Sequence, residues 1–80
     1  MPEYKTKDIF EASWIYSQKA PLLRLDPDGN YFWFVFANDE NFTSSLSEKY
    51  WRQTATGNIK EYVNSLKSLK DLIFSQKHNY

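Results

Sequence analysis

The chain has 80 residues, of which 10 are basic and 10 are acidic, so its formal net charge is zero. A chain of this length is too short for two independent cores, and we predict a single domain over 1–80 with an ordered core at about 4–76. The charge is uneven, with net −3 over 1–40 (4 basic, 7 acidic) and net +3 over 41–80 (6 basic, 3 acidic). This modest asymmetry excludes the strongly basic footprint of a dedicated duplex-DNA binder.

Many aromatic residues and no cysteine characterise the composition. The 3 Trp, 6 Tyr and 6 Phe are enough for a compact core without covalent links, because each ring buries roughly 150–250 Å². Small secreted domains usually carry disulfides, so a chain without cysteine favours a reducing compartment. The segment Met1–Lys5 has no apolar signal core, and no apolar run is long enough to span a bilayer. We therefore expect a cytoplasmic protein with no membrane partner.

The first predicted element is a helix from Thr6 to about Gln18. Threonine is a good N-cap, and Asp8 in the first turn suits the helix dipole. Pro21 ends this helix, because proline disfavours helical geometry in the residue before it.

A β-hairpin follows the first helix. Leu22–Leu25 is compatible with a short strand, and Asp26–Asn30 is a strong turn signal because it combines Pro, Asp and Gly. The second strand, Tyr31–Phe36, is the strongest element in the sequence. Successive side chains of a strand alternate between its faces, so its three Phe residues share one face and Tyr31 and Trp33 share the other.

Two further helices complete the chain. Asn38 or Asp39 caps a helix over about 40–53, and Asn58, with Glu61 three residues later, caps a last helix that runs to about Gln76. The predicted fold class is therefore α+β, a β-hairpin packed against three short helices in the order α-β-β-α-α. A lone hairpin is unstable in water, so it must pack on the helices or pair with another hairpin.

The Tyr31 and Trp33 face of the strand permits two interpretations. If the face is open, it is similar to the platforms on which single-stranded nucleic acid bases stack, with Lys5, Lys7, Arg24 or Arg52 near the sheet to contact phosphates. Otherwise a helix or a second subunit covers it, as is usual for aromatic residues in strands. The Lys/Arg-Gly-Phe pattern of an RNA-recognition strand is absent.

The last helix carries an apolar seam and a basic stripe. The seam indicates either packing within the monomer or a homodimer contact. The basic stripe indicates either phosphate binding or an ordinary solvated helix face. The seam consists of Ile59, Tyr62, Leu66, Leu69 and Ile73, and the stripe of Lys60, Lys67 and Lys70.

Motifs for catalysis and for metal binding are missing. The single histidine, His78, lies close to the C-terminus, and one histidine without cysteine makes no zinc site. The serines lack a Gly-x-Ser-x-Gly elbow, and Asp26–Asn30 lacks the glycine and glutamate spacing of a calcium loop. We expect four acidic residues to lie at helix ends or in solvent: Glu11, Asp39, Glu40 and Glu48. We expect no enzyme activity, no cofactor and no metal.

Four segments resemble a known family. They are Tyr4-Lys5-Thr6-Lys7-Asp8, the Phe32-x-Phe34-Val35-Phe36 strand, Tyr50-Trp51 and the Leu66–Ile73 stretch of the last helix. Together they are similar to a family of short bacterial and archaeal proteins of unknown function, often found in phages, plasmids and other mobile elements. The resemblance covers about Tyr4 to Ser75 and implies a shared fold and a mobile-element context. It brings no catalytic or binding residues with it.

The sequence therefore favours a small non-enzymatic binding module. The leading interpretation is that it binds single-stranded nucleic acid. The alternative is that it is a phage-encoded inhibitor or adaptor that binds a host protein. A homodimer through the sheet or the last helix is a third interpretation. The candidate binding residues are Tyr31, Trp33, Arg24, Arg52, Lys60, Lys67 and Lys70.

Overall fold

The computed structural model describes residues 2–78, which form a three-stranded antiparallel sheet and three α-helices. This confirms the α+β class, the hairpin and the number of helices expected from the sequence. The elements in chain order are β1 (Glu3–Thr6), α1 (Ile9–Ser17), β2 (Leu22–Asp28), β3 (Tyr31–Ala37), a 3₁₀ turn (Asp39–Asn41), α2 (Phe42–Trp51) and α3 (Ile59–His78). The last of these has 20 residues and is not short.

The first strand, β1, is the element that the sequence analysis missed, so the order is β-α-β-β-α-α. The prediction that Thr6 is the N-cap of the first helix is wrong, because the backbone of Thr6 is extended and pairs with Phe34 of β3. Asp8 caps α1 instead, and its Oδ1 accepts hydrogen bonds from the backbone N–H groups of Phe10 (2.8 Å) and Glu11 (3.1 Å).

The sheet has the order β1-β3-β2, so the aromatic strand β3 lies between the other two. Phe34 is in register with Thr6 on one side and Leu25 on the other, while Val35 is in register with Lys5 and Arg24. Residues directly opposite one another in a sheet point to the same face. The register therefore collects apolar side chains on the Phe34 face and charged side chains on the Val35 face.

The hairpin turn is shorter than predicted. Asp26–Asp28 belongs to β2, and only Gly29 and Asn30 connect the two strands. Gly29 has φ +62°, whereas Asn30 has no positive φ, which is the pattern of a type II′ turn. Its first central position needs glycine because other residues rarely adopt positive φ.

The caps of α2 and α3 match the predictions in part. Asn38 Oδ1 accepts a hydrogen bond from Ser44 N (2.9 Å), but α2 begins at Phe42 because Glu40 and Asn41 have φ of 53° and 61°, which interrupts the helix. Asn58 caps α3 as expected: its Oδ1 accepts from Glu61 N at 3.0 Å.

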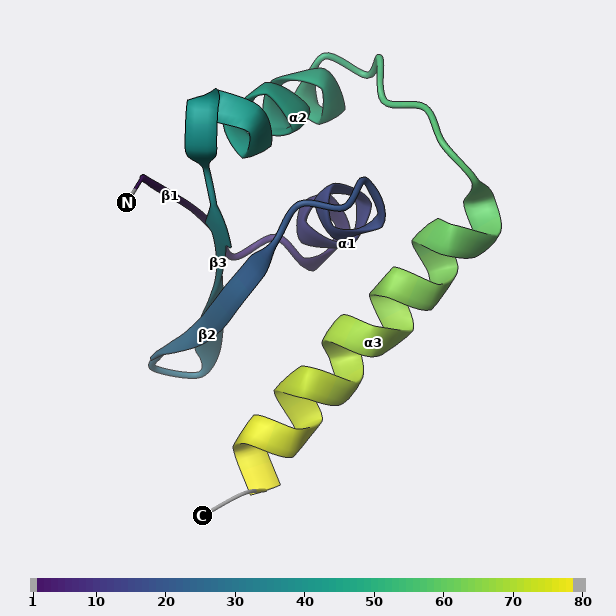
Figure 1. The fold of residues 1–80 in the computed structure, drawn as a ribbon. Helices are drawn as coiled ribbons and strands as arrows, with labels where there is room; N and C mark the ends of the chain where they lie inside the picture. The colour runs from purple at the N-terminus through teal and green to yellow at the C-terminus, as the bar shows by residue number, and fades with distance from the viewer. Residues whose placement is uncertain (1, 79–80) are drawn as a thin grey trace.

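The core lies on the Phe34 face of the sheet. Figure 1 shows α1 between the sheet and α3, with α2 beyond one end of the strands. Phe34 and Phe36 of β3 are buried against Ile15 of α1 and Leu69 of α3. In residues 2–78, no helix is both long and apolar enough to cross a membrane.

Candidate functional site: the open face of the sheet

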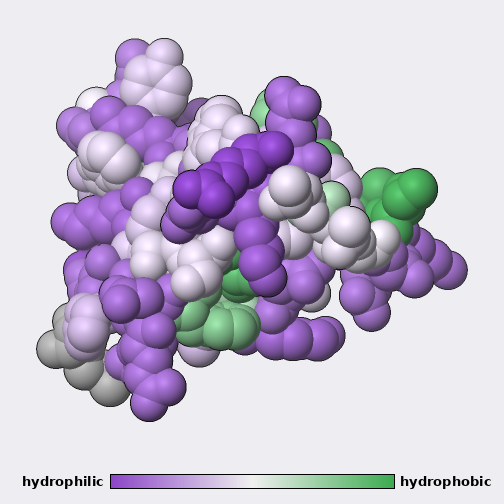
Figure 2. All heavy atoms as spheres, turned by 90° about the horizontal axis from the view of Figure 1, so that it is seen from above, coloured by the Kyte–Doolittle hydropathy of each residue, from purple (hydrophilic) through white to green (hydrophobic). Residues whose placement is uncertain are grey.

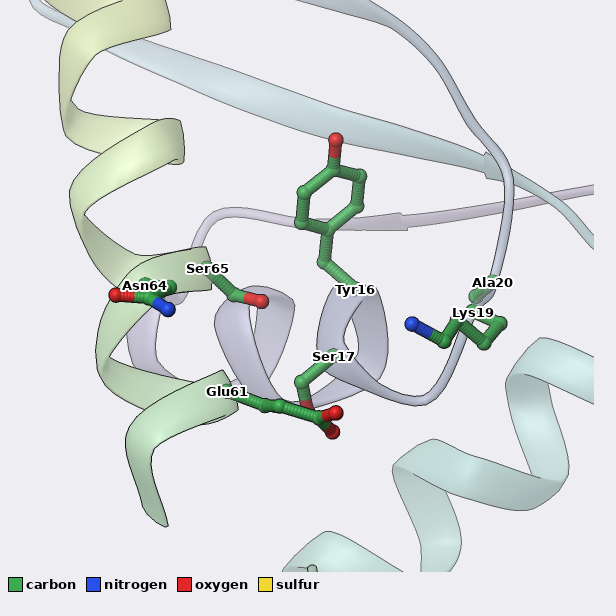
Figure 3. Close-up of a pocket in the computed structure, with 7 residues that line it drawn as sticks. All are labelled: Tyr16, Ser17, Lys19, Ala20, Glu61, Asn64 and Ser65. Atoms are coloured by element: carbon green, nitrogen blue, oxygen red, sulfur yellow. The ribbon is translucent and has the colours of Figure 1, made fainter. Parts of the chain in front are cut away.

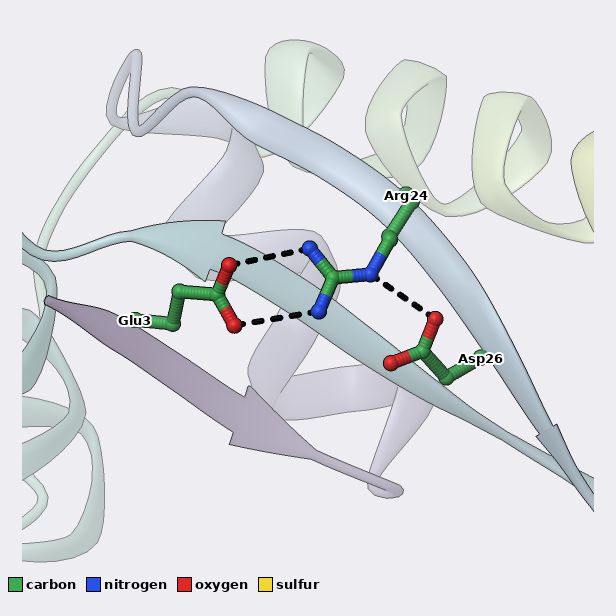
Figure 4. A network of polar contacts seen from close by, with 3 residues as sticks. All are labelled: Glu3, Arg24 and Asp26. Atoms are coloured by element: carbon green, nitrogen blue, oxygen red, sulfur yellow. Dashed lines mark hydrogen bonds and ion pairs between the residues drawn. The ribbon is translucent and has the colours of Figure 1, made fainter. Parts of the chain in front are cut away.

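The Val35 face of the sheet carries no helix in the described chain. In Figure 1, α1 and α3 lie on one side of the strands and α2 lies beyond one end of them, and Figure 4 looks onto the other side. The residues on it come from all three strands, and we refer to them as the open face: Glu3, Lys5, Arg24, Asp26, Asp28, Tyr31, Trp33 and Val35.

Arg24 covers the middle of the open face. Its guanidinium reaches from β2 across β3 and donates to both carboxylate oxygens of Glu3 on β1, at 2.9 and 3.0 Å. Its Nε donates to Asp26 Oδ1 at 2.9 Å (Figure 4). The bond to Arg24 lowers the pKa of Glu3. Val35, in register with Arg24, is fully buried although no helix covers it, so charged side chains seal this part of the sheet.

A second group occupies the hairpin end of the open face. Lys7, which follows β1, places its Nζ 2.9 Å from Asp28 Oδ2, 4.7 Å from the centre of the Trp33 ring and 5.8 Å from that of Tyr31. Trp33 Nε1 donates to the same Asp28 oxygen at 3.2 Å. The bond to Lys7 lowers the pKa of Asp28. We refer to Lys7, Asp28, Tyr31 and Trp33 as the Lys7 cluster.

The formal charges on this side of the sheet cancel. Three cations and three carboxylates lie there, and ion pairs join all of them except Lys5, which makes no ion pair within residues 2–78. The balance offers little net attraction for phosphate groups. The cations are Lys5, Lys7 and Arg24, and the carboxylates are Glu3, Asp26 and Asp28.

The structure separates the predicted site residues into three places. Tyr31, Trp33 and Arg24 come together on the open face. Arg52, expected near the sheet, lies at the C-terminal end of α2, where it forms an ion pair with Glu48 one turn earlier (2.6 Å). The three lysines of the basic stripe are exposed on α3, in the helical layer on the other side of the sheet: Lys60, Lys67 and Lys70.

Glu11 is the polar residue that the sequence analysis misjudged. It was expected to be solvated, but only 2% of it is exposed. Its carboxylate accepts hydrogen bonds from the hydroxyls of Tyr4 (2.5 Å), Thr6 (2.6 Å) and Ser47 (2.5 Å). The group therefore ties β1, α1 and α2 together, and it could have been recognised only by placing Tyr4 and Thr6 on one face of a strand.

A depression of about 430 Å³ lies on the other side of the molecule, between α1 and α3 (Figure 3). The Ser17 hydroxyl donates to the backbone carbonyl of Trp14 at 2.6 Å. The residues that line the depression are Tyr16, Ser17, Lys19, Ala20, Glu61, Asn64 and Ser65.

The face of the molecule seen in Figure 2 has no single large apolar region. Hydrophilic residues dominate this face, and the hydrophobic ones form small separate areas. Exposed apolar side chains are nevertheless present outside the open face, including Ile59 at the start of α3 and Trp51 at the end of α2.

No family model, curated protein or solved structure matches this chain. Its function must be inferred from its own geometry.

Proposed function

We propose that this chain is a small non-catalytic binding module that takes a partner protein on the open face of its sheet. The observation that carries the proposal is the position of Tyr31, which is 67% exposed on the central strand of a face without a helix. Aromatic side chains of this kind are frequent anchors of protein interfaces, because they bury a large area with little loss of conformational entropy.

The charge pattern favours a protein over a nucleic acid as the partner. Asp26 and Asp28 flank Trp33, and phosphates that approached the rings would meet these carboxylates. A protein surface can match both signs of charge, and alternating charges contribute to specificity in such interfaces.

Single-stranded nucleic acid is the second candidate partner, because two aromatic rings share the open face. Tyr31 and Trp33 are two residues apart on the central strand, so their side chains share a face and could stack on neighbouring bases. Lys5 on the same face makes no ion pair within residues 2–78 and is available for a phosphate.

The cellular setting is part of the same proposal. The absence of cysteine and the resemblance to proteins of mobile elements support a cytoplasmic inhibitor or adaptor that meets a host protein.

The experiment compares Tyr31→Ala with Trp51→Ala, which removes another exposed aromatic ring, on α2. The wild type and both variants are used to capture partners from lysates of the native cells. We expect Tyr31→Ala to lose a partner that Trp51→Ala retains. Equal capture by the two variants would contradict the use of the open face.

Fluorescence anisotropy with labelled single-stranded oligonucleotides tests the second candidate. Nucleic-acid binding predicts an affinity that falls steeply with salt and that decreases in Tyr31→Ala but not in Trp51→Ala. Absence of binding at low salt would remove nucleic acid as a partner.

A further inference from the structure

The Lys7 cluster has the composition of a site for an alkylammonium group. Proteins hold such cations over the faces of aromatic rings, with Trp the strongest partner, within about 6 Å of the ring centre. The ammonium of Lys7 meets this condition for Trp33 (4.7 Å) and Tyr31 (5.8 Å), and Asp28 supplies the opposite charge at 2.9 Å.

The two rings and the carboxylate are held together independently of Lys7. Trp33 Nε1 donates to Asp28 Oδ2. Asp28 and Tyr31 are opposite each other in the backbone register, as the last pair before the hairpin turn. The three side chains therefore sit on one rigid β-hairpin that ends in a two-residue turn.

Lys7, in contrast, comes from the short segment between β1 and α1, and 41% of its side chain is exposed. A lysine side chain has four rotatable bonds and is strongly hydrated, so it can leave the cluster without moving the backbone. The cation is the replaceable member of the group.

We propose that Tyr31, Trp33 and Asp28 form a binding site for a lysine side chain of the partner, and that Lys7 occupies this site in the free protein. The inference rests on the proposed function and adds the chemistry by which the open face recognises its partner. Exchange of one ammonium for another preserves the charge balance of the site. The displaced Lys7 is then free to pair with a carboxylate next to the incoming lysine.

The test uses small ammonium probes and the indole N–H signal of Trp33 in NMR spectra, assigned with Trp33→Phe. The probes are Nα-acetyl-lysine amide and its Nε-trimethyl form. In Lys7→Met the site is empty, and we expect saturable shifts with an affinity about tenfold higher than in the wild type, where the probe must displace Lys7. Lys5→Met is the matched control, because it removes a cation from the same face but leaves Lys7 in place, and it should bind like the wild type.

Loss of probe binding in Lys7→Met/Asp28→Asn and in Lys7→Met/Tyr31→Ala, with the remaining spectrum intact, would support the assignment to these side chains. No saturable shift of the Trp33 signal in folded Lys7→Met would overturn the proposal. Affinities equal in the wild type and Lys7→Met would overturn the role of Lys7 as occupant.

The two proposals fail in different ways. If the probes bind as described but Tyr31→Ala still captures every partner, the ammonium site stands and the proposed function is wrong. If Tyr31→Ala loses its partner but Lys7→Met binds no probe, the open face is the interface and the lysine site is wrong.

Discussion

At the scale of single residues, the buried Glu11 carboxylate has the strongest structural consequence. It forms no ion pair within residues 2–78, and its hydrogen bonds come from two hydroxyls of β1 and one of α2. Hydrogen bonds to a charged group contribute more than neutral ones, and an unsatisfied buried carboxylate is costly. The hydroxyls of Tyr4, Thr6 and Ser47 should therefore matter more to stability than their size suggests.

Tyr4→Phe tests this point, because it removes one hydroxyl and keeps the ring. We expect a loss of about 1–3 kcal/mol in the free energy of unfolding, measured by urea denaturation. Tyr31→Phe is the matched control: its hydroxyl is on an exposed side chain, and the change should cost about 0.5 kcal/mol or less. Equal stability of Tyr4→Phe and the wild type would contradict the proposed role of the hydroxyl.

Tyr4 also makes the stability of the fold depend on pH in the alkaline range. Burial, with the bond to Glu11 adding to it, raises the pKa of Tyr4 to about 12 from its ordinary value near 10. The folded state holds this proton more tightly than the unfolded chain. Its contribution is complete below about pH 10 and is lost as the pH rises to about 12.

We therefore expect the unfolding free energy of the wild type to fall more steeply than that of Tyr4→Phe between about pH 10 and pH 12. Urea denaturation series at closely spaced pH values measure both curves. Tyr50 and Tyr62, whose pKa values are also raised, are present in both proteins, so their contributions cancel in the comparison. Parallel curves would show that Tyr4 does not titrate with a raised pKa.

At the scale of the elements, the hairpin is the part that depends most on local sequence. Gly29 has φ +62°, and a Cβ added there would meet no atom within 4 Å. The cost of Gly29→Ala is therefore conformational and not steric. It should be about 1–2 kcal/mol in the free energy of unfolding, whereas Asn30→Ala, at the next turn position, should cost less because Asn30 has no positive φ. Denaturant unfolding of the two variants distinguishes them, and equal costs would argue against the turn geometry.

Local signals also explain which elements the sequence could predict. The turn residues, the alternation in Tyr31–Phe36 and the Asn58 cap act within a few residues, so the hairpin and the start of α3 were predictable. Strand β1 was not predictable in this way. It has four residues and is fixed by pairing with β3, about 30 positions later, while Thr6 and Asp8 also form a good helix start.

In the candidate site, too, local sequence predicts some features, and the others depend on pairing between distant strands. Alternation alone placed Tyr31 and Trp33 on one face, but it could not decide whether a helix or a second subunit covers that face. The role of Lys7 depends on β1 lying next to β3, and the bridge from Arg24 to Glu3 depends on both edge strands. Sequence reasoning placed the rings together and Lys7 and Arg24 near them, but without β1 it could not supply the ion pairs that these two cations form with Asp28 and Glu3.

At the scale of the whole molecule, the surfaces differ in how well they suit a second copy. The free edge of β2 is poorly suited, because Pro27 lacks an N–H group and a register shift between Leu22 and Arg24 interrupts the strand. The outer side of α3 would bring like charges together, since Lys67 and Lys70 lie with Ile59, Val63 and Phe74 within about 80° of arc.

Of these three surfaces, the open face is the best suited to a homodimer, because its equal numbers of cations and carboxylates allow two copies to match. Analytical ultracentrifugation over a range of concentrations tests this hypothesis. A homodimer through the open face predicts association of the wild type that is lost in Tyr31→Ala and retained in Lys67→Glu, which alters α3 alone. Association that survives in Tyr31→Ala would move the interface elsewhere, and a monomer at every concentration would remove the homodimer. In that case the exposed rings of β3 would remain available to a different protein, as the proposed function requires.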